Sequence, residues 1–391
     1  MNKVQETFLF QDKINNDVKK AWLANVLAHH LLVVGQTGSG KTTTTLSLLN
    51  QLQHLNQTTI VFDPTGEYAQ LPNAITYQLG ANAYLEAGTL SAHELQEVLQ
   101  LHLPVQLRNK LVQAITALRV QHNILEQDGV YKKCGQAIAD YQQKLAQLAA
   151  WTTDYQPQEL FNQLIEEFVI PYDDQRADYH LLGQRYDRQA IARNWDSLTT
   201  IREYLASTMF ATIFDSYEHP GVFKTELSFV LKMFLNHRST HRTLVIDLSV
   251  LKDYEESQRV LISFLMKKIL RLRLQRPQNI PVNIVIDEAH RYLPQNEEKL
   301  ADNGIFQVLR EGRKVHLKVL LTTQSPLDLP TRLRSQFSNA VIHRLIDDDE
   351  MRSLGIIDFP ETIKNLDIGK AYLKMGDKLA SVRVEEPNWW K

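Results

Sequence analysis

The chain has 391 residues and a formal net charge of −2, with 43% hydrophobic and 23% charged residues, a composition typical of a globular protein rather than a disordered chain. No apolar run reaches the roughly 20 residues that span a bilayer, and residues 1–17 lack the apolar core of a secretory signal, so we expect no membrane contact and a cytoplasmic location. Cys134 is the only cysteine, which excludes an intrachain disulfide.

The first elements alternate strand and helix. Leu31–Val34 is a short apolar run that leads into a glycine-rich turn, and leucines recur at near-helical spacing over residues 43–55. A second apolar run, Thr58–Phe62, ends at Asp63, where the proline that follows stops the strand. Two strands joined by a helix predict a βαβ unit.

The composition changes at about Ser91. From there to residue 215 the chain is rich in Leu, Gln, Ala, Glu and Arg and has almost no β-branched runs. Apolar residues at helical spacing, such as Leu160, Leu164 and Phe168, indicate several amphipathic helices. We interpret residues 91–225 as a helical insertion into an α/β domain.

The alternation of strands and helices then returns. Strands are expected at Thr243–Leu248, Val282–Ile286 and Lys318–Thr323, with helices at Tyr254–Leu274 and Phe306–Arg310 between them. Shorter strands are expected at 340–345, 370–374 and 380–384. The predicted fold is therefore α/β, with a mostly parallel sheet covered on both faces. Its predicted parts are a lead segment (1–27), a first core part (28–90), the insertion (91–225), a second core part (226–345) and a C-terminal extension (346–391).

A phosphate-binding loop lies between the first strand and the first helix. Its residues are Gly35, Gln36, Thr37, Gly38, Ser39, Gly40, Lys41 and Thr42, with Thr43 next to them, and they match the motif at every fixed position. The glycines let backbone N–H groups turn toward phosphate oxygens, and the following helix presents its positive end. Lys41 is predicted to contact the β and γ phosphates of ATP, and the Thr42 hydroxyl to hold Mg²⁺.

Two acids follow the strand Val282–Ile286. Ligands bind beyond the carboxyl ends of strands in open parallel sheets, where Asp287 and Glu288 would meet the phosphate loop. Asp287 is predicted to position Mg²⁺ and Glu288 to activate the attacking water as a general base. The alternative is a buried strand that ends in a solvated acidic turn.

Two further polar groups are candidates. Gln324 ends the strand Lys318–Thr323, where its amide could touch both the γ-phosphate and the water, although polar strand ends also cap helices. Arg313 is one of three cationic residues within residues 310–314. It could act as an arginine finger on a neighbouring subunit's γ-phosphate, or the cations could simply form a solvated helix end.

Four short motifs, in this order, resemble the HerA family. Besides the phosphate loop they are Asp63-Pro64-Thr65-Gly66-Glu67-Tyr68, Ile286-Asp287-Glu288-Ala289-His290-Arg291, Arg310-Glu311-Gly312-Arg313-Lys314 and Thr323-Gln324. The likeness extends over most of residues 28–345, and the long helical insertion also resembles that family.

The resemblance implies a RecA-like motor domain that forms a hexameric ring around double-stranded DNA and translocates with ATP and Mg²⁺, often beside a nuclease partner. Carried onto the matching positions, it implies an active site of Lys41, Thr42, Asp63, Asp287, Glu288, Gln324 and Arg313, with Arg313 acting across a subunit interface. Asp63 and Glu67 have an alternative as turn formers, because Asp-Pro and Gly favour turns by themselves.

Two features depart from the family pattern. About thirty residues precede the phosphate loop, too few to close the N-terminal β-barrel that HerA-like proteins generally carry. The family tends to place Arg-His before the first strand, whereas this chain has His29 and His30, so a second cation at the nucleotide site is in doubt unless a protonated His29 replaces it.

The leading hypothesis is thus a ring-forming DNA motor. The alternative is a regulatory ATPase ring that assembles or licenses an effector, for example in antiviral defence, without sustained translocation. A monomeric small-molecule kinase is disfavoured, because no acceptor site is recognisable. With a net charge near zero, DNA contact requires a local basic patch. The basic stretches at 237–242 and 267–276 are candidates, although solvated helix faces would explain them as well.

Overall fold

The structure is a computed structural model that describes residues 7–8, 25–149, 153–214, 223–236, 242–294, 296–356 and 360–389. It divides into two compact units, the first formed by residues 1–79 and 229–391 and the second by residues 80–228. The predicted insertion, residues 91–225, lies within the second unit. Most of the predicted lead segment, residues 1–27, lies outside the described residues.

The first unit is built on a ten-stranded sheet. Its strands are β1 (Thr7–Phe8), β2 (Leu31–Val34), β3 (Thr58–Asp63), β4 (Ala74–Gln78), β9 (Thr243–Asp247), β10 (Val282–Ile286), β11 (Leu317–Thr323), β12 (Asn339–Ile342), β13 (Lys370–Met375) and β14 (Lys378–Arg383). Their spatial order is β1-β14-β13-β12-β2-β11-β10-β3-β9-β4. Every pair in this sheet is parallel except the two pairs that β13 makes.

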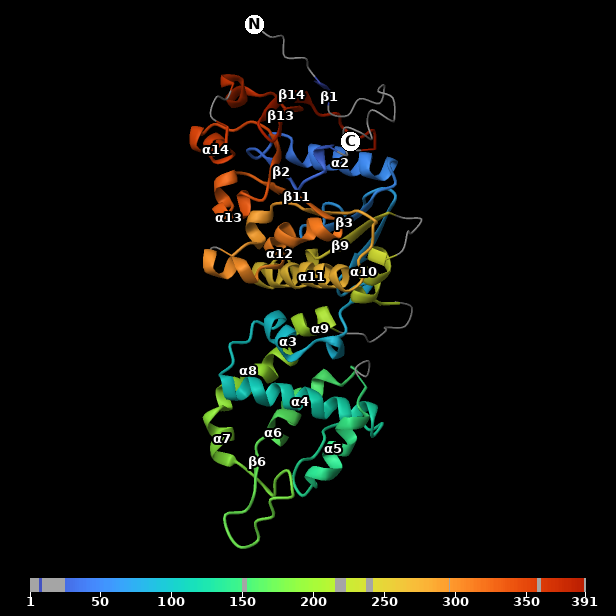
Figure 1. The fold of residues 1–391 in the computed structure, drawn as a ribbon, viewed down its shortest axis with the longest axis vertical. Coiled ribbons are helices and arrows are strands. Elements are labelled where there is room, and N and C mark those ends of the chain that lie inside the picture. Colours follow the sequence, from blue (N-terminus) through green and yellow to red (C-terminus); the bar gives the residue numbers. More distant parts are fainter. Residues whose placement is uncertain are drawn as a thin grey trace. The chain divides into compact units, whose positions relative to one another are not determined.

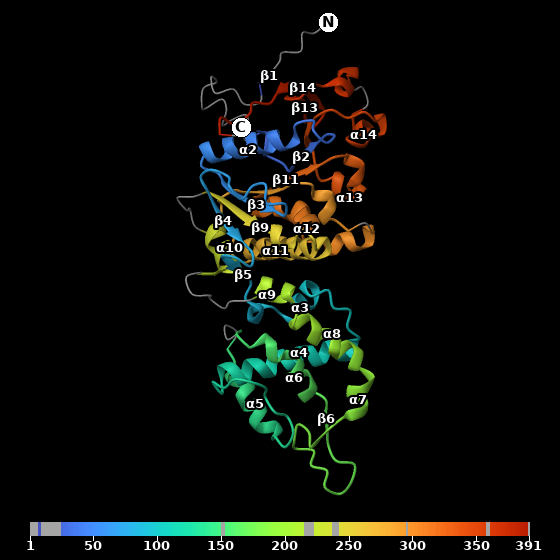
Figure 2. The ribbon, with the colours of Figure 1, turned by 180° about the vertical axis from the view of Figure 1, so that it is seen from behind.

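Burial explains why the central strands are almost continuously apolar. All residues of β2, β3, β9 and β10 are buried, so both faces of the sheet must be covered. Helix α2 (Lys41–His54) covers one face, and helices α11 (Glu255–Gln275) and α12 (Gly304–Glu311) cover the other (Figures 1 and 2). Leu46 and Leu49 of α2 pack in one cluster with Val33 of β2.

Helices α11 and α12 approach each other very closely at Gly304. A Cβ atom at that position would lie 1.9 Å from the carbonyl oxygen of Ser263, so only glycine allows this contact. Asn303 begins α12, because its side chain accepts a hydrogen bond from the Ile305 N–H at 2.9 Å. The remaining helices associated with the sheet are α10 (Leu227–Asn236), α13 (Thr331–Arg334) and α14 (Asp348–Ser353).

The second unit consists mainly of helices. These are α3 (Ala92–Val98), α4 (Val105–Asn123), α5 (Ile138–Gln147), α6 (Leu160–Glu166), α7 (Arg188–Arg193), α8 (Trp195–Leu205) and α9 (Thr208–Phe214). Two small sheets accompany them, one pairing β5 (Ala83–Tyr84) with β8 (Thr225–Glu226) and one pairing β6 (Val169–Ile170) with β7 (Arg185–Tyr186). Inside the unit, the buried Lys133 and Glu167 form an ion pair at 3.3 Å.

The predicted C-terminal extension adds to the main sheet, because β13 and β14 continue it beyond β12. After β14 the chain returns to α2, where the Trp389 indole donates a hydrogen bond to the Asn50 side chain at 3.2 Å. Trp389 thus packs on its own core, while Trp390 lies outside the described residues. In the part of the chain that the structure describes, no helix combines the length and apolarity of a membrane span.

Candidate functional site

The glycine-rich loop, residues 35–40, joins β2 to α2 and forms an open cradle. Gly35 leaves no room for a side chain, because a Cβ there would lie 2.5 Å from the His343 Cβ and 2.6 Å from the Ser39 Oγ. Gly38 has a φ of +76° and nothing within 4 Å of its Cβ position. The loop is therefore closely packed at its start and open at its middle, as an anion-binding backbone turn requires.

Lys41 connects this loop to the acidic motif. Its side chain is buried, and its Nζ donates hydrogen bonds to the carbonyl oxygens of Gly35 at 2.8 Å and Gln36 at 3.4 Å. The same Nζ lies 3.6 Å from the Glu288 Oε1. The two predicted motifs therefore meet through a direct ion pair, which supports the expected convergence of the phosphate loop and the acids.

The sheet register explains why they meet. Strand β11 lies between β2 and β10, with Thr323 paired to Val34 and Leu321 paired to Ile286. Because the three strands are parallel, their carboxyl ends lie at one edge of the sheet. The acids after β10 and the phosphate loop after β2 consequently face the same region.

Asp287 is held by three donors at this edge. Its Oδ2 accepts from the Tyr68 hydroxyl at 2.7 Å, and its Oδ1 accepts from the Glu288 N–H at 3.0 Å and from the Thr322 hydroxyl. The side chain is nearly inaccessible, with 8% exposure. These contacts fix the orientation of the Asp287 carboxylate, and its role as a Mg²⁺ ligand stays a prediction.

Glu288 has an unfavourable backbone conformation. Its φ of +47° and ψ of +46° lie in the left-handed region, which glutamate rarely adopts. The Thr322 hydroxyl holds this conformation by accepting the Glu288 N–H at 2.8 Å. The Glu288 side chain lies between Lys41 and His290. The distance from the His290 Nδ1 to the Glu288 Oε2 is 3.4 Å. Backbone strain of this kind is characteristic of functional positions.

Asp63 holds a turn. Its Oδ1 accepts from the Gly66 N–H at 2.8 Å and the Thr65 hydroxyl at 3.3 Å, and its Oδ2 accepts from the Tyr68 N–H at 2.8 Å. Burial raises the pKa of Asp63, and the turn N–H groups oppose that rise. These contacts are those of a turn former that carries Tyr68 toward Asp287, while a catalytic role for Asp63 stays a prediction.

Glu67 adds a further carboxylate to this edge of the sheet. Desolvation raises its pKa first, followed by repulsion from Asp287, Asp63 and Glu288. Glu67 therefore lies close enough to Asp287, Asp63 and Glu288 for their charges to act on it.

The two remaining predicted residues, Gln324 and Arg313, lie at opposite ends of strand β11. Gln324 follows the carboxyl end of β11 and is exposed beside the acids. Arg313 belongs to the short helix η6 (Gly312–Val315), which precedes β11, and its side chain is exposed. Because β11 spans seven residues, about 20 Å of strand separates Arg313 from the phosphate loop of its own chain. Arg313 is thus not brought together with the other site residues within one chain.

His30 is a structural residue rather than a cationic substitute. Its Nε2 donates to the Leu309 carbonyl at 2.9 Å, and its Nδ1 accepts the Val319 N–H at 3.0 Å. Burial above all lowers the pKa of His30 to about 4, so the ring is neutral at pH 7. His30 also precedes β2, at the edge of the sheet opposite the phosphate loop. His30 therefore supplies no cation to the nucleotide site, while the replacement of the family's arginine by a protonated His29 stays a prediction.

The proposed DNA contact of the basic stretches stays a prediction. Residues 237–241 of the first stretch lie outside the described residues. In the second stretch Arg273 is completely buried and donates to the carbonyl oxygens of Gln278 at 3.1 Å and Ile280 at 2.7 Å. Arg273 therefore fixes the chain after α11 and is unavailable to a ligand.

Sequence reasoning missed three polar side chains of the site: Thr322, His290 and His343. Thr322 and His290 support Glu288, and the Thr323 hydroxyl lies 3.3 Å from the His290 Nδ1. His343 contacts the Thr44 hydroxyl at 2.8 Å, and burial, then Lys41, lowers the pKa of His343 to about 4. Thr322 lies in β11 and His343 directly follows β12, so a polar residue at the end of an apolar strand signals these two, whereas His290 lies in the short helix after β10.

The arrangement fits a nucleotide with Mg²⁺. The buried Ser39 hydroxyl has no hydrogen-bond partner among the described residues, and a phosphate oxygen would supply one. Thr42 is half-buried at the end of the loop, and its hydroxyl and the Asp287 carboxylate are hard oxygen ligands. Mg²⁺ usually takes only one or two such protein groups and completes its shell with phosphate oxygens and water.

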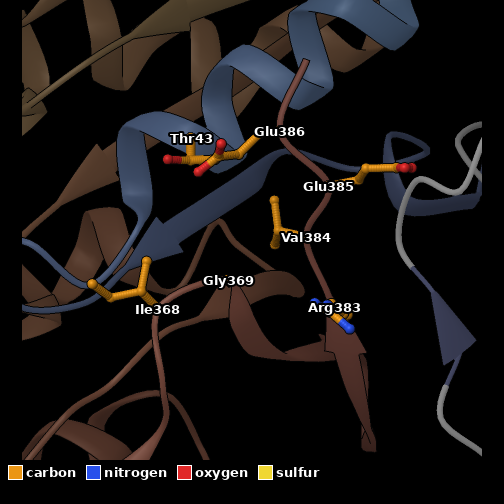
Figure 3. A pocket seen from close by; sticks show the side chains of 7 residues that line it. All are labelled: Thr43, Ile368, Gly369, Arg383, Val384, Glu385 and Glu386. Carbon is orange, nitrogen blue, oxygen red and sulfur yellow. The ribbon is translucent and has the colours of Figure 1, made fainter. Parts of the chain in front are cut away.

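A cavity of about 450 Å³ adjoins the start of α2. Figure 3 shows the residues that surround it, which come from α2, from the segment just before β13, and from the end of β14 and the segment after it. Its lining residues are Thr43, Ile368, Gly369, Arg383, Val384, Glu385 and Glu386. The cavity has the size of a small-molecule site.

The chain is similar in sequence to known helicases. The chain is 22% identical over 372 residues to a DNA double-strand break repair helicase HerA of Saccharolobus solfataricus, covering 92% of this chain and 64% of the relative. It is 23% identical to a probable helicase of Methanocaldococcus jannaschii, covering 91% and 62%. The chain thus spans less than two thirds of the length of these relatives.

A solved structure resembles the fold. Plasmid coupling protein TrwB in complex with ADP and Mg²⁺ matches with a TM-score of 0.56 and 15% identity, covering 99% of this chain and 91% of that chain. A likeness at this identity shows the fold alone, and it confirms the predicted RecA-like α/β architecture with a mostly parallel sheet.

The family itself is established by a profile of aligned sequences. The model described as "Helicase HerA, central domain" matches residues 20–269, which is more than half of the chain and includes the phosphate loop and the helical unit. With the acids after β10 meeting that loop as the motif order predicts, the chain belongs to the HerA helicase central-domain family.

Proposed function

We propose that this protein is a Mg²⁺-dependent ATPase that forms a ring and translocates on double-stranded DNA. The observation that carries the proposal is the meeting of Lys41 and Glu288 at 3.6 Å beside an open phosphate loop, with Asp287 fixed next to them. A phosphate-binding cation, a metal ligand and a general base thereby share one edge of the sheet.

Each residue has a distinct role in this proposal. The loop N–H groups and Lys41 bind the β and γ phosphates, and Thr42 and Asp287 hold Mg²⁺, which neutralises charge on the phosphates. Glu288 takes the proton of the attacking water, with His290 and Thr322 holding it in place. Gln324 is exposed at the same edge, where it can orient that water.

Arg313 supports a ring rather than a monomer. An exposed arginine about one strand length, roughly 20 Å, from its own phosphate loop cannot serve its own nucleotide. A head-to-tail contact would bring it to the neighbour's site, and such heterologous contacts close into rings. We therefore propose a ring of six subunits in which Arg313 stabilises transition-state charge across each interface.

Double-stranded DNA is the proposed track, supported by relatives that are named as DNA double-strand break repair helicases. A nuclease or another effector is the proposed partner. The chain spans less than two thirds of the length of those relatives, so the partner is proposed from the family resemblance alone.

The test combines turnover, translocation and particle shape. Phosphate release from ATP is measured with and without long duplex DNA, displacement of a third DNA strand reports translocation, and electron microscopy with an ATP analogue reports the particle. We expect DNA-stimulated turnover, strand displacement and closed rings, all lost in Lys41→Ala.

The outcomes separate the hypotheses. Turnover and rings without strand displacement would favour a regulatory ATPase that licenses an effector. A persistent monomer that hydrolyses ATP would refute the ring, and a well-folded chain without any turnover in the presence of DNA would refute the motor.

A further inference from the structure

We propose that the β13–β14 hairpin forms the binding pocket for the ribose and base of the nucleotide, with Glu386 as the acceptor for the ribose hydroxyls. The pocket is the cavity of about 450 Å³ lined by residues 43, 368–369 and 383–386. This inference rests on the proposed ATPase function, because it assigns the nucleoside end of the same ligand.

The hairpin reaches the correct edge of the sheet. Strand β13 runs antiparallel to β12, so its first residues lie beside the carboxyl end of β12, where Tyr372 pairs with Ile342. Strand β14 returns to that edge, and Arg383 pairs with Lys370. Ile342 in turn pairs with Val34, the last residue before the phosphate loop. Both walls of the pocket therefore lie at the edge that carries the loop.

The walls are joined to each other and packed against the loop. The Val384 N–H donates to the Gly369 carbonyl at 2.8 Å, which fixes the two chain segments together. A Cβ at Gly40, the last residue of the loop, would lie only 3.7 Å from the Gly369 nitrogen. The pocket therefore lies next to the phosphate loop, because Gly369 packs on Gly40 and Thr43 belongs to the lining.

The direction of the bound nucleotide follows from the order of the strands. The γ-phosphate must lie near Glu288, which follows β10 on one side of β2. The nucleoside must then leave the loop on the other side of β2, toward β12, β13 and β14. The cavity lies on that side, and Thr43 is common to the cavity and the start of α2.

The chemistry of the lining suits a ribonucleoside better than a phosphate. Glu385 and Glu386 are exposed carboxylates that repel phosphate but accept hydrogen bonds from hydroxyl and amino groups. In Figure 3 the Glu386 side chain lies toward Thr43, whereas that of Glu385 extends the opposite way. Ile368 is 73% exposed, so an aromatic base placed on it would cover an apolar side chain that is otherwise in water.

The experiment compares ligands that contain or lack the ribose hydroxyls and the whole nucleoside. Binding of ATP, 2′,3′-dideoxy-ATP and inorganic tripolyphosphate is measured for the full chain, for Glu386→Ala and for Asp377→Ala. Asp377 is an exposed carboxylate in the turn at the other end of the hairpin, so its substitution removes the same charge away from the pocket.

We expect the unsubstituted chain to bind ATP about tenfold more tightly than dideoxy-ATP, the effect of one hydrogen bond to a charged group. Glu386→Ala should weaken ATP binding by about tenfold and abolish that sugar preference. It should leave tripolyphosphate binding unchanged or stronger, because a repelling charge is removed. Asp377→Ala should change none of these affinities.

A sugar preference that survives Glu386→Ala, or that is absent from the unsubstituted chain, would overturn the assignment. So would a parallel loss of ATP and tripolyphosphate affinity in Glu386→Ala. A chain that binds neither ATP nor tripolyphosphate would instead refute the proposed ATPase function, so the two failures are distinguishable.

Discussion

The ion pair between Lys41 and Glu288 predicts opposite effects of two substitutions on nucleotide binding. Lys41 is predicted to bind phosphate in the ground state, whereas Glu288 is needed when water loses its proton. Without nucleotide the two side chains neutralise each other at 3.6 Å. Phosphate must therefore compete with Glu288 for the lysine, and removal of the Glu288 charge should help binding.

The size of that competition can be estimated from the geometry. Unit charges 3.6 Å apart attract by about 4–5 kcal/mol at an effective dielectric constant of about 20, and by about 1 kcal/mol in water. The Glu288 side chain is 25% exposed and that of Lys41 is 7% exposed, so solvent screening and desolvation offset most of the larger value. A net contribution of about 1 kcal/mol corresponds to about fivefold in affinity.

We expect Glu288→Gln to bind ATP as tightly as the unsubstituted chain or up to about fivefold more tightly. Its turnover should fall by about a hundredfold to ten-thousandfold, the usual contribution of a general base. Lys41→Ala should lose about tenfold to a hundredfold in ATP affinity, because it removes a charge-assisted hydrogen bond to phosphate.

Calorimetric titration with ATP and Mg²⁺ measures the affinities, and phosphate release at saturating ATP measures turnover. Circular dichroism confirms that both variants are folded. Equal loss of affinity in the two variants, or weaker ATP binding by Glu288→Gln, would refute the assigned division of labour.

Three further predictions follow from individual side chains. Arg313→Ala alone should bind ATP without hydrolysing it, and rings mixed with Glu288→Gln subunits should regain phosphate release; assembled mixed rings that stay inactive would show that Arg313 does not act across the interface. Asp63→Ala should lower the free energy of unfolding by about 2–3 kcal/mol, because it leaves turn N–H groups unpaired, and a loss of turnover at unchanged stability in chemical denaturation would favour a catalytic role instead. The pKa values of His30 and His343 are lowered to about 4, so each ring must stay neutral in the folded state. As the pH falls from 6.5 to 4, each histidine should therefore lower the free energy of unfolding by up to about 3 kcal/mol. Chemical denaturation at several pH values measures this, and a pH dependence that is equally steep in His343→Asn would contradict the prediction for His343.

The central fold and the meeting of the two nucleotide motifs could be predicted because their signals are local. The phosphate loop is defined by spacing within eight residues, and an apolar strand that ends in two acids is visible without a structure. Parallel pairing then places both at one edge, which the Lys41–Glu288 distance bears out. The edge strand β4 went unpredicted, because its five residues are only half-buried and lack a continuous apolar run.

Contacts between distant parts of the chain could not be predicted. Nothing in the sequence signals that His30 and His343 are buried. Yet each contacts a residue about 280–300 positions away, since His30 bonds to Leu309 and Thr44 bonds to His343. The placement of β13 and β14 beside β12 also depends on tertiary pairing. For that reason the wall that they form near the phosphate loop was not foreseen.

The strand order of the large sheet also determines when the sheet can form during synthesis. None of the strands described in residues 1–79 pairs with another of them: β2 pairs with β11 and β12, β3 with β9 and β10, β4 with β9, and β1 with β14. Every one of these partners lies beyond Arg242. A nascent chain therefore carries four strands without native partners until the ribosome has made about 250 residues. The helical unit, residues 80–228, is complete before any of those partners exists and can fold first. Until the partner strands have been synthesised, the apolar strands of residues 1–79 stay exposed. During that time the nascent chain is most prone to aggregate or to be bound by chaperones.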